Sequence, residues 1–226
     1  MQLYLVRHAE SENNARPAYL RVEDPGITAV GRLQAQHLAD WVRTMAFDHL
    51  ITSPFLRTLQ TTRYVTDATG APVSIWDNVY ERGGCFRGHG PDATEGGIGL
   101  GRSGVIRHVV AQADRCTVDS SIGEAGWWAG KPRETDDEAE VRATTVVQRF
   151  AETFGDSQDV VVAIIHADLK RAMLRHMLAP GADAGLFGAL RNVGVTKLDF
   201  SAGTWQLDWF NSVTHLPSKL ITGNES

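Results

Sequence analysis

The sequence predicts an α/β fold: a three-layer, doubly wound sheet that is mostly parallel and has an antiparallel edge. Short apolar runs alternate with longer segments of helical periodicity, as they do in successive βα units. The run at 159–165 is apolar on both faces, which is typical of a parallel strand buried inside a sheet. Two late runs, at 193–200 and 204–210, lie a few residues apart and predict a hairpin on the sheet edge.

The first half of the chain supplies three strands and two helices. A strand covers 3–6 and stops at Arg7 and His8, and two further strands are expected at 47–51 and 73–76. The first helix starts after Thr28, its N-cap, and keeps helical spacing to about residue 45. Ser53 and Pro54 predict the start of the second helix, with Ser53 as N-cap and Pro54 at the first helical position, and Gly70 is its C-cap.

Residues 82–137 break this alternation and hold 12 of the 22 glycines. We expect one domain, 1–226, in which 82–137 is an insertion that covers the active site, with one helix near 103–113. Trp127 and Trp128 are interpreted as the core of this insertion rather than as a substrate platform.

Regular structure resumes after the insertion. A helix is expected at 138–154, with its apolar residues turned inward, and another at 168–178, ended by Pro180 and Gly181. The apolar residues of the first of these helices are Val141, Val147, Phe150 and Phe154.

Composition excludes several classes of function. The chain has 226 residues, 42% of them hydrophobic, and a formal net charge of −5, which argues against a nucleic-acid partner or an anionic membrane. No apolar run approaches the length of a membrane span, and the chain reads straight into a strand with no signal peptide, so we expect a cytoplasmic protein. Cys85 and Cys116 have no metal-like spacing and are expected to be reduced thiols.

Five charged or titratable residues follow strand ends or open a helix. The strands at 3–6 and 159–165 end in Arg7-His8 and His166, Arg57 lies in the first turn of a helix, and Glu81 follows the third strand. The carboxyl ends of parallel strands share one edge of a sheet, where ligands bind. Two arginines beside two histidines predict a pocket for a phosphoryl group, because planar guanidinium groups match phosphate oxygens.

The same residues resemble the signatures of the histidine phosphatase superfamily, also called the phosphoglycerate mutase-like family. Its motif Arg-His-Gly-x-Ser/Thr-x-x-Asn is similar to residues 7–14, Arg-His-Ala-Glu-Ser-Glu-Asn-Asn. Its motifs Leu-Thr-x-x-Gly-x-x-Gln-Ala and Ser-Pro-x-x-Arg-x-x-Gln-Thr are similar to 27–35 and 53–61. Glu81-Arg82-Gly83, the strand ending at His166 and the Asn211–Leu216 segment also look like the family, so the similarity covers nearly the whole chain outside 85–135.

The resemblance implies phosphoryl transfer through a phosphohistidine on His8. Arg7, Arg57 and His166 would hold the phosphoryl oxygens with help from Asn14, and Glu81 would act as general acid and then base. Alanine replaces the family's usual glycine at Ala9 and Ala167, and the backbone N–H of Ala167 is expected to face the phosphate. No cofactor and no metal are expected.

Substrate contacts are also expected from basic residues of the insertion, among which Arg102 is selected. The substrate would be a small phosphorylated metabolite. The insertion carries seven Lys/Arg against eight Asp/Glu, which favours a hydrolase over a mutase that must retain its product.

Other interpretations stay open. They are a phosphoglycerate mutase-type transferase, a metal-dependent phosphoesterase that uses His8, Glu10, His166 and Asp168 as ligands, and a non-catalytic phosphate-binding protein. Glu81 alone could also be a surface carboxylate paired with Arg82. The oligomeric state, including a homodimer, is left open.

Overall fold

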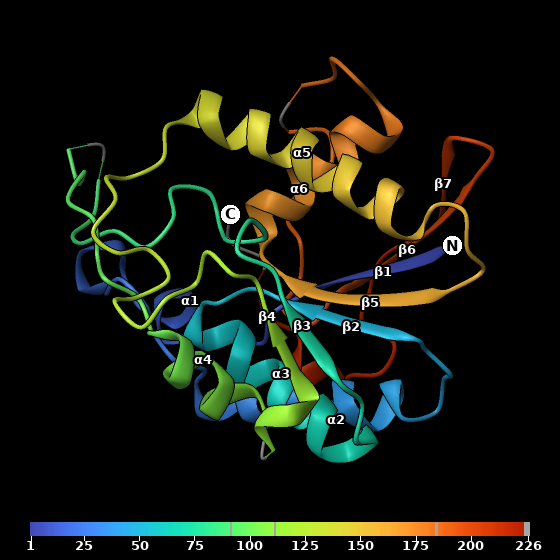
Figure 1. Cartoon of the computed structure of the whole chain (residues 1–226), viewed down its shortest axis with the longest axis horizontal. Coiled ribbons are helices and arrows are strands. Elements are labelled where there is room, and N and C mark those ends of the chain that lie inside the picture. Colours follow the sequence, from blue (N-terminus) through green and yellow to red (C-terminus); the bar gives the residue numbers. More distant parts are fainter. Residues whose placement is uncertain (91, 111, 184, 224–226) are drawn as a thin grey trace.

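The computed structural model describes residues 1–90, 92–110, 112–183 and 185–223, and it contains a seven-stranded sheet between two layers of helices (Figure 1). The strand order is β4-β3-β2-β5-β1-β6-β7. The strands are β1 (Gln2–Arg7), β2 (His49–Thr52), β3 (Val73–Ile75), β4 (Cys116–Val118), β5 (Val160–Ile165), β6 (Val195–Ser201) and β7 (Thr204–Ser212). The first five are parallel, whereas β6 and β7 form an antiparallel edge, so the predicted fold class is confirmed.

The helices cover both faces of the sheet. Figure 1 shows α5 and α6 on one face and α2, α3 and α4 on the other. In the described part of the chain the helices are α1 (Glu12–Ala15), α2 (Ala29–Val42), α3 (Leu56–Thr69), α4 (Arg102–Val109), α5 (Asp136–Phe154) and α6 (Ala167–Leu178), with 3-10 turns at Ala18–Leu20, Ala113–Arg115 and Ser218–Leu220.

Two apolar cores follow from the alternation of side chains along the strands. Leu3 and Leu5 of β1 pack with residues of α5 and α6, whereas Tyr4 and Val6 pack with residues of α2 and α3. β5 divides its side chains between the two cores in the same way. Because both faces of β1 and β5 are buried, their register is fixed, and so is the position of the residues that follow them.

The start of α3 differs from the sequence prediction. The helix begins at Leu56 with Phe55 at the N-cap position, so the prediction that Ser53 caps it and Pro54 opens it is wrong. Asp24, from the loop before α2, accepts a hydrogen bond from the amide of Leu56 over 2.8 Å and satisfies one of the free donors. Gly70 ends α3 with φ +68°, as predicted.

The 82–137 segment contributes to the sheet itself. β4 pairs with β3, and α4, which matches the helix predicted near 103–113, packs beside α3. The segment therefore extends the sheet, which its glycine-rich composition did not reveal. Trp127 and Trp128 are buried and pack against Phe55 and Tyr80, in agreement with a core role.

The inward face of α5 is mostly as predicted. Phe150 and Phe154 are buried and Val147 packs against the same core, but Val141 is 69% exposed, so its predicted inward position is wrong. Thr135 and Glu138 form a capping box that starts the helix at Asp136, slightly earlier than expected. Among the described residues, no helix is both long and apolar enough to cross a lipid bilayer.

Candidate active site

The carboxyl ends of β1 and β5 bring His8 and His166 together. The two strands are parallel neighbours in which Arg7 lies opposite Ile165, so the next residue on each is a histidine. The amide of His8 donates to the carbonyl of Ile165 over 2.9 Å, and the two imidazole centroids lie 5.2 Å apart. The predicted meeting of the two imidazoles is therefore confirmed.

His8 presents an unprotonated ring nitrogen to Arg57. Its Nδ1 lies 2.7 Å from the carbonyl of Ala9, which only accepts, so Nδ1 carries the proton. The Nε of Arg57, which only donates, lies 3.2 Å from Nε2, so Nε2 holds the lone pair. Burial lowers the pKa of His8 well below its usual value, and the charges of Arg57 and Arg7 lower it further. His8 is therefore neutral at pH 7, with a lone pair on Nε2.

Arg57 is fixed at the beginning of α3. Its guanidinium lies over the ring of Phe55, 4.0 Å from the centroid, and it is 8% exposed. Burial lowers the pKa of Arg57, while the negative charges of Asp24 and Glu81 raise it. Asp24 therefore neutralises part of the charge of Arg57 and also binds the amide of Leu56, the preceding residue. The sequence analysis missed Asp24.

Arg7 is buried beside His8 and keeps an unused donor. Its Nη1 donates to the carbonyl of Leu190, and its Nε has no partner among the described residues. Burial lowers the pKa of Arg7 to about 10, and the charge of Glu81 partly opposes that effect. Arg7 is therefore charged at pH 7, and an anion at the cavity would supply the missing acceptor.

His166 is fully buried and does not line the cavity. Its Nε2 lies 2.8 Å from Oγ of Ser53, and its Nδ1 has no hydrogen-bond partner in the described part of the protein. Burial lowers the pKa of His166 well below its usual value, with the charge of Arg57 as the next cause. The hydroxyl of Ser53 therefore holds this imidazole, instead of capping α3.

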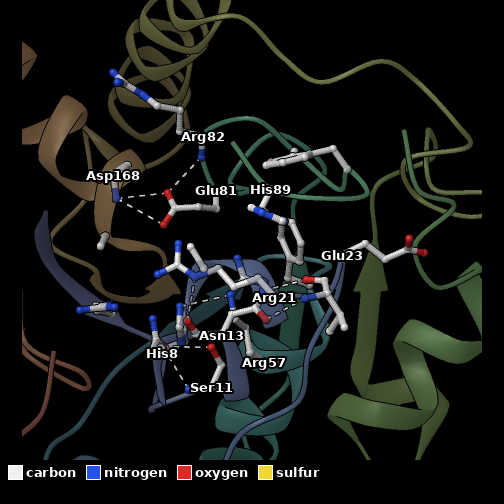
Figure 2. Close-up of a pocket in the computed structure, with 18 of the residues that line it drawn as sticks. His8, Ser11, Asn13, Arg21, Glu23, Arg57, Glu81, Arg82, His89 and Asp168 are labelled. Atoms are coloured by element: carbon white, nitrogen blue, oxygen red, sulfur yellow. Dashed lines mark hydrogen bonds between the residues drawn. The ribbon is translucent and has the colours of Figure 1, made fainter. Parts of the chain in front are cut away.

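Glu81 lies at the N-terminus of α6, where Figure 2 shows its carboxylate facing the backbone of Asp168. Its Oε1 accepts hydrogen bonds from the amides of Arg82, Asp168 and Leu169 over 3.0, 3.1 and 3.2 Å. Burial and the nearby charge of Asp168 raise the pKa of Glu81, while the charge of Arg57 and the amides of Arg82 and Leu169 lower it. The net direction is upward, which suits a carboxyl group that exchanges protons near neutral pH.

Asn14 and Ala167 also line the cavity. Oδ1 of Asn14 accepts from the amide of Ser11 over 3.0 Å, so the side-chain NH₂ group of Asn14 can face a ligand. Ala167 begins α6, and its amide is therefore among those without a partner inside the helix. The amide of Ala9 instead donates to Oγ1 of Thr61, so it does not face the cavity. Neither alanine has a positive φ, so the substitution for glycine causes no backbone strain.

Arg102 is not brought to this site. Its guanidinium donates to the backbone carbonyls of Val118, Asp119 and Ile122, so it holds β4 and the turn after it. The prediction that Arg102 contacts substrate is therefore not supported. Arg102 does not line the cavity, and its guanidinium is engaged by backbone carbonyls of the insertion. A count of charges in the insertion could not separate such a structural arginine from a ligand-binding one.

The residues surround a cavity of about 410 Å³, within the usual size of small-ligand sites. The sequence analysis missed several of the residues that line this cavity. They come from the loop after α1 and from both ends of the insertion, and include Arg21, Glu23, Gly84, Phe86, His89 and Arg133. Figure 2 shows His89 at the pocket. Arg133 is one of the seven Lys/Arg of the insertion, and no sequence pattern distinguishes it from the others.

A metal site of the kind left open by the sequence does not form here. In residues 1–90, 92–110, 112–183 and 185–223, no three His, Cys, Asp or Glu side chains gather as ligands. Glu10 instead accepts from the hydroxyl of Thr28, and Asp168 pairs with Arg171. A neutral imidazole flanked by two guanidinium groups and a proton-exchanging carboxyl group is suited to phosphoryl chemistry.

Comparison with protein families gives a match over most of the chain. Residues 3–95 and 111–213 match the model of the histidine phosphatase superfamily (branch 1). The "Probable phosphoglycerate mutase GpmB" of Photorhabdus laumondii is 24% identical over 98% of this chain and 97% of its own length. The protein of the same name from Enterobacter sp. is 39% identical, but that match spans only 33% of this chain and 35% of the relative.

Solved structures share the fold. A phosphoserine phosphatase mutant from Entamoeba histolytica, in complex with phosphoserine, superposes with a TM-score of 0.62 at 20% identity, covering 96% of this chain and 99% of that one. A mycobacterial glucosyl-3-phosphoglycerate phosphatase gives a TM-score of 0.62 at 19% identity, with 93% and 98% covered. The alpha-ribazole phosphatase from Shigella flexneri gives 0.62 at 17% identity, with 94% and 96% covered.

Proposed function

Because the chain belongs to the histidine phosphatase superfamily, we propose that it hydrolyses a small phosphorylated metabolite through a phosphohistidine on His8. The observation that carries this proposal is the hydrogen-bond pattern of His8. Nδ1–H donates to Ala9 and Nε2 keeps its lone pair beside Arg57, so the ring is oriented as a nucleophile before substrate arrives.

In the first step, the Nε–H of Arg57 moves from Nε2 of His8 to a phosphoryl oxygen, which frees the lone pair of Nε2. Nε2 then attacks phosphorus while the bond from phosphorus to the leaving oxygen breaks. Arg7 and Arg57 balance the charge on the non-bridging oxygens, with Asn14 as a further donor and the amide of Ala167 at the N-terminus of α6. His166 does not line the cavity, so we propose that it supports the ring of His8, against which it packs. Glu81 gives its proton to the leaving oxygen. Its raised pKa supports this role, because the carboxyl group must be protonated when the step begins.

In the second step, Glu81 takes a proton from water, and the resulting hydroxide oxygen attacks the phosphorus of the phosphohistidine. The bond to Nε2 breaks, inorganic phosphate leaves, and His8 and Glu81 return to their starting states. This sequence needs no redox partner, and we propose that it needs neither a metal nor a cofactor.

A mutase-type phosphoryl transferase is the second candidate, favoured by the name of the relative that aligns over the whole chain. The hydrolase is preferred because the insertion is not strongly basic: its seven Lys/Arg face eight Asp/Glu. A mutase must retain a phosphorylated product while that product reorients, which favours a basic and water-excluding cover.

The test is a panel of phosphoesters that includes phosphoserine, 2- and 3-phosphoglycerate and sugar phosphates, assayed in excess EDTA. We expect phosphate release from at least one of them, abolished in His8→Ala and retained in His108→Ala, a histidine away from the cavity. Isomerisation of the phosphoglycerates that outpaces release would favour the mutase. Phosphate binding without any turnover, or activity that needs a divalent metal, would contradict the proposal.

A further inference from the structure

The cavity carries more positive charge than one phosphoryl group requires. Six arginines and three carboxylates are found among the described residues that line it. The arginines are Arg7, Arg21, Arg57, Arg82, Arg133 and Arg171, and the carboxylates are Glu23, Glu81 and Asp168. Arg7 and Arg57 lie beside His8, so the other four are available for neutralisation by the protein or by a ligand.

Two of these four arginines are neutralised by the protein. Arg82 pairs with Glu140 over 2.9 Å, and Arg171 pairs with Asp168. The remaining two are Arg21 and Arg133. Glu23 neutralises neither of them, because its carboxylate pairs with Arg87, outside the cavity, over 2.9 Å. Within the described chain, Arg21 and Arg133 therefore have no carboxylate partner.

Arg21 is held in place before any ligand binds. The side-chain amide of Asn13 donates to the carbonyl of Val22 over 2.7 Å, and its Oδ1 accepts from the amide of Val22 over 3.0 Å. This pair of hydrogen bonds fixes the loop that carries Arg21. The Nε of Arg21 donates to the carbonyl of Asn13 over 3.1 Å, which leaves both terminal nitrogens free for another acceptor.

Arg133 is similarly fixed from the far end of the insertion. Its guanidinium lies over the ring of Phe86, 4.4 Å from the centroid, and its Nη1 donates to the carbonyl of Gly90 over 2.8 Å. Nη2 remains available. Figure 2 shows Arg21 and His89 at the same pocket, although they belong to segments far apart in the sequence.

From this charge balance, we infer that the substrate carries a second anionic group, a carboxylate or another phosphate, which Arg21 and Arg133 bind away from His8. The inference rests on the proposed function, because it concerns the part of the substrate that is not transferred. Two oriented guanidinium groups bind a carboxylate or a phosphate through charge-assisted hydrogen bonds, which are stronger than those between neutral groups. A substrate with a neutral or cationic distal end would leave both charges unpaired.

The test compares phosphoesters that differ only in the second anion. Phosphoserine and phosphoethanolamine differ by one carboxylate, and fructose 1,6-bisphosphate and fructose 6-phosphate differ by one phosphate. We expect kcat/KM to be higher for the member that carries the second anionic group, in at least one of the two pairs. The pair that shows this preference identifies whether that group is a carboxylate or a phosphate. Arg21→Gln and Arg133→Gln should each reduce that preference about tenfold or more.

Arg107→Gln is the matched control, because it removes one exposed guanidinium of the insertion that does not line the cavity. It should leave the preference unchanged. The inference is overturned if neither pair shows a preference, or if both variants lower kcat/KM equally for both members of the pair. If no phosphoester is hydrolysed, the proposed function fails. The inference is then decided by calorimetric binding of the same pairs to the wild type and to both variants, where equal affinities contradict it.

Discussion

At the scale of single residues, the site depends on keeping His8 uncharged next to two guanidinium groups. Burial of the imidazole and the charges of Arg57 and Arg7 all disfavour the imidazolium, so they lower the pKa of His8 together. The hydrogen bond to the carbonyl of Ala9 acts in the opposite direction but also fixes which nitrogen holds the proton. The same arrangement that prepares the nucleophile therefore makes the folded protein sensitive to acid.

This effect can be measured as a pH dependence of stability. The pKa of His8 is lower in the folded chain than in the unfolded chain, so below pH 6.5 the unfolded chain binds more protons. The stabilisation is present above pH 6.5 and is lost as the pH falls. As the pH falls below 6.5, the free energy of unfolding measured in urea should decrease more steeply for the wild type than for His8→Gln. The two slopes should differ by up to about 1.4 kcal/mol per pH unit. Identical slopes for the two proteins would contradict this account.

Four of the five residues proposed for catalysis could be predicted from the sequence because each stands next to a recognisable element boundary, whereas Glu81 lies in the loop after β3. Arg7, His8 and His166 follow apolar strands, and neighbouring parallel strands must end at the same edge. Arg21 and Arg133 could not be found in this way. Their positions depend on hydrogen bonds of Asn13 and on packing against Phe86, and neither leaves a periodic pattern in the sequence.

At the scale of elements, the N-terminus of α3 is stabilised by a residue from another loop. The sequence predicts a local cap at Ser53, but the hydroxyl of Ser53 bonds to His166, and Asp24 binds the amide of Leu56 instead. A local motif cannot reveal this exchange, because it depends on which residues tertiary packing brings near the helix. The same loop carries Arg21 and Asp24, so it joins the cavity wall to the helix that holds Arg57.

Asp24 should therefore have a measurable effect on stability. Burial raises the pKa of Asp24 to about 6, so between about pH 4 and pH 6 the folded chain binds more protons than the unfolded one. The protonated form of Asp24 therefore favours the folded state. This contribution to stability is fully present below about pH 4 and is lost as the pH rises through 6. Asp24→Asn keeps an acceptor for the amide of Leu56 but does not titrate.

We expect the free energy of unfolding of the wild type, relative to that of Asp24→Asn, to fall as the pH rises from 4 to 6. Urea unfolding of both proteins at several pH values measures this difference directly. A difference that stays constant across this range would show that Asp24 titrates alike in the folded and unfolded chains.

At the scale of the whole molecule, the sheet with two buried faces fixes the site. The alternation and apolar runs in the sequence predict this architecture, because burial on both faces requires them. They do not predict β4, which is only three residues long and lies in a glycine-rich segment. Periodicity also fails at Val141, where an apolar residue of α5 faces solvent.

The two faces of α5 offer a matched test of this core. Phe150 is fully buried and packs against Trp76, whereas Val141 on the same helix is 69% exposed. Phe150→Ala should lower the free energy of unfolding by about 3–5 kcal/mol, because it leaves a cavity. Val141→Ala should change it by less than about 0.5 kcal/mol. Chemical denaturation measures both, and a large loss for Val141→Ala would contradict the placement of α5.

The central claim is that a phosphoryl group is transferred to His8, and rapid quenching during turnover tests it most directly. With a ³²P-labelled phosphoester that the protein hydrolyses, stopped within the first turnover, we expect an acid-labile and base-stable label on the peptide that contains His8. The label should be absent from His8→Ala. Hydrolysis that proceeds with no labelled protein at any time, or with the label on another side chain, would contradict the account.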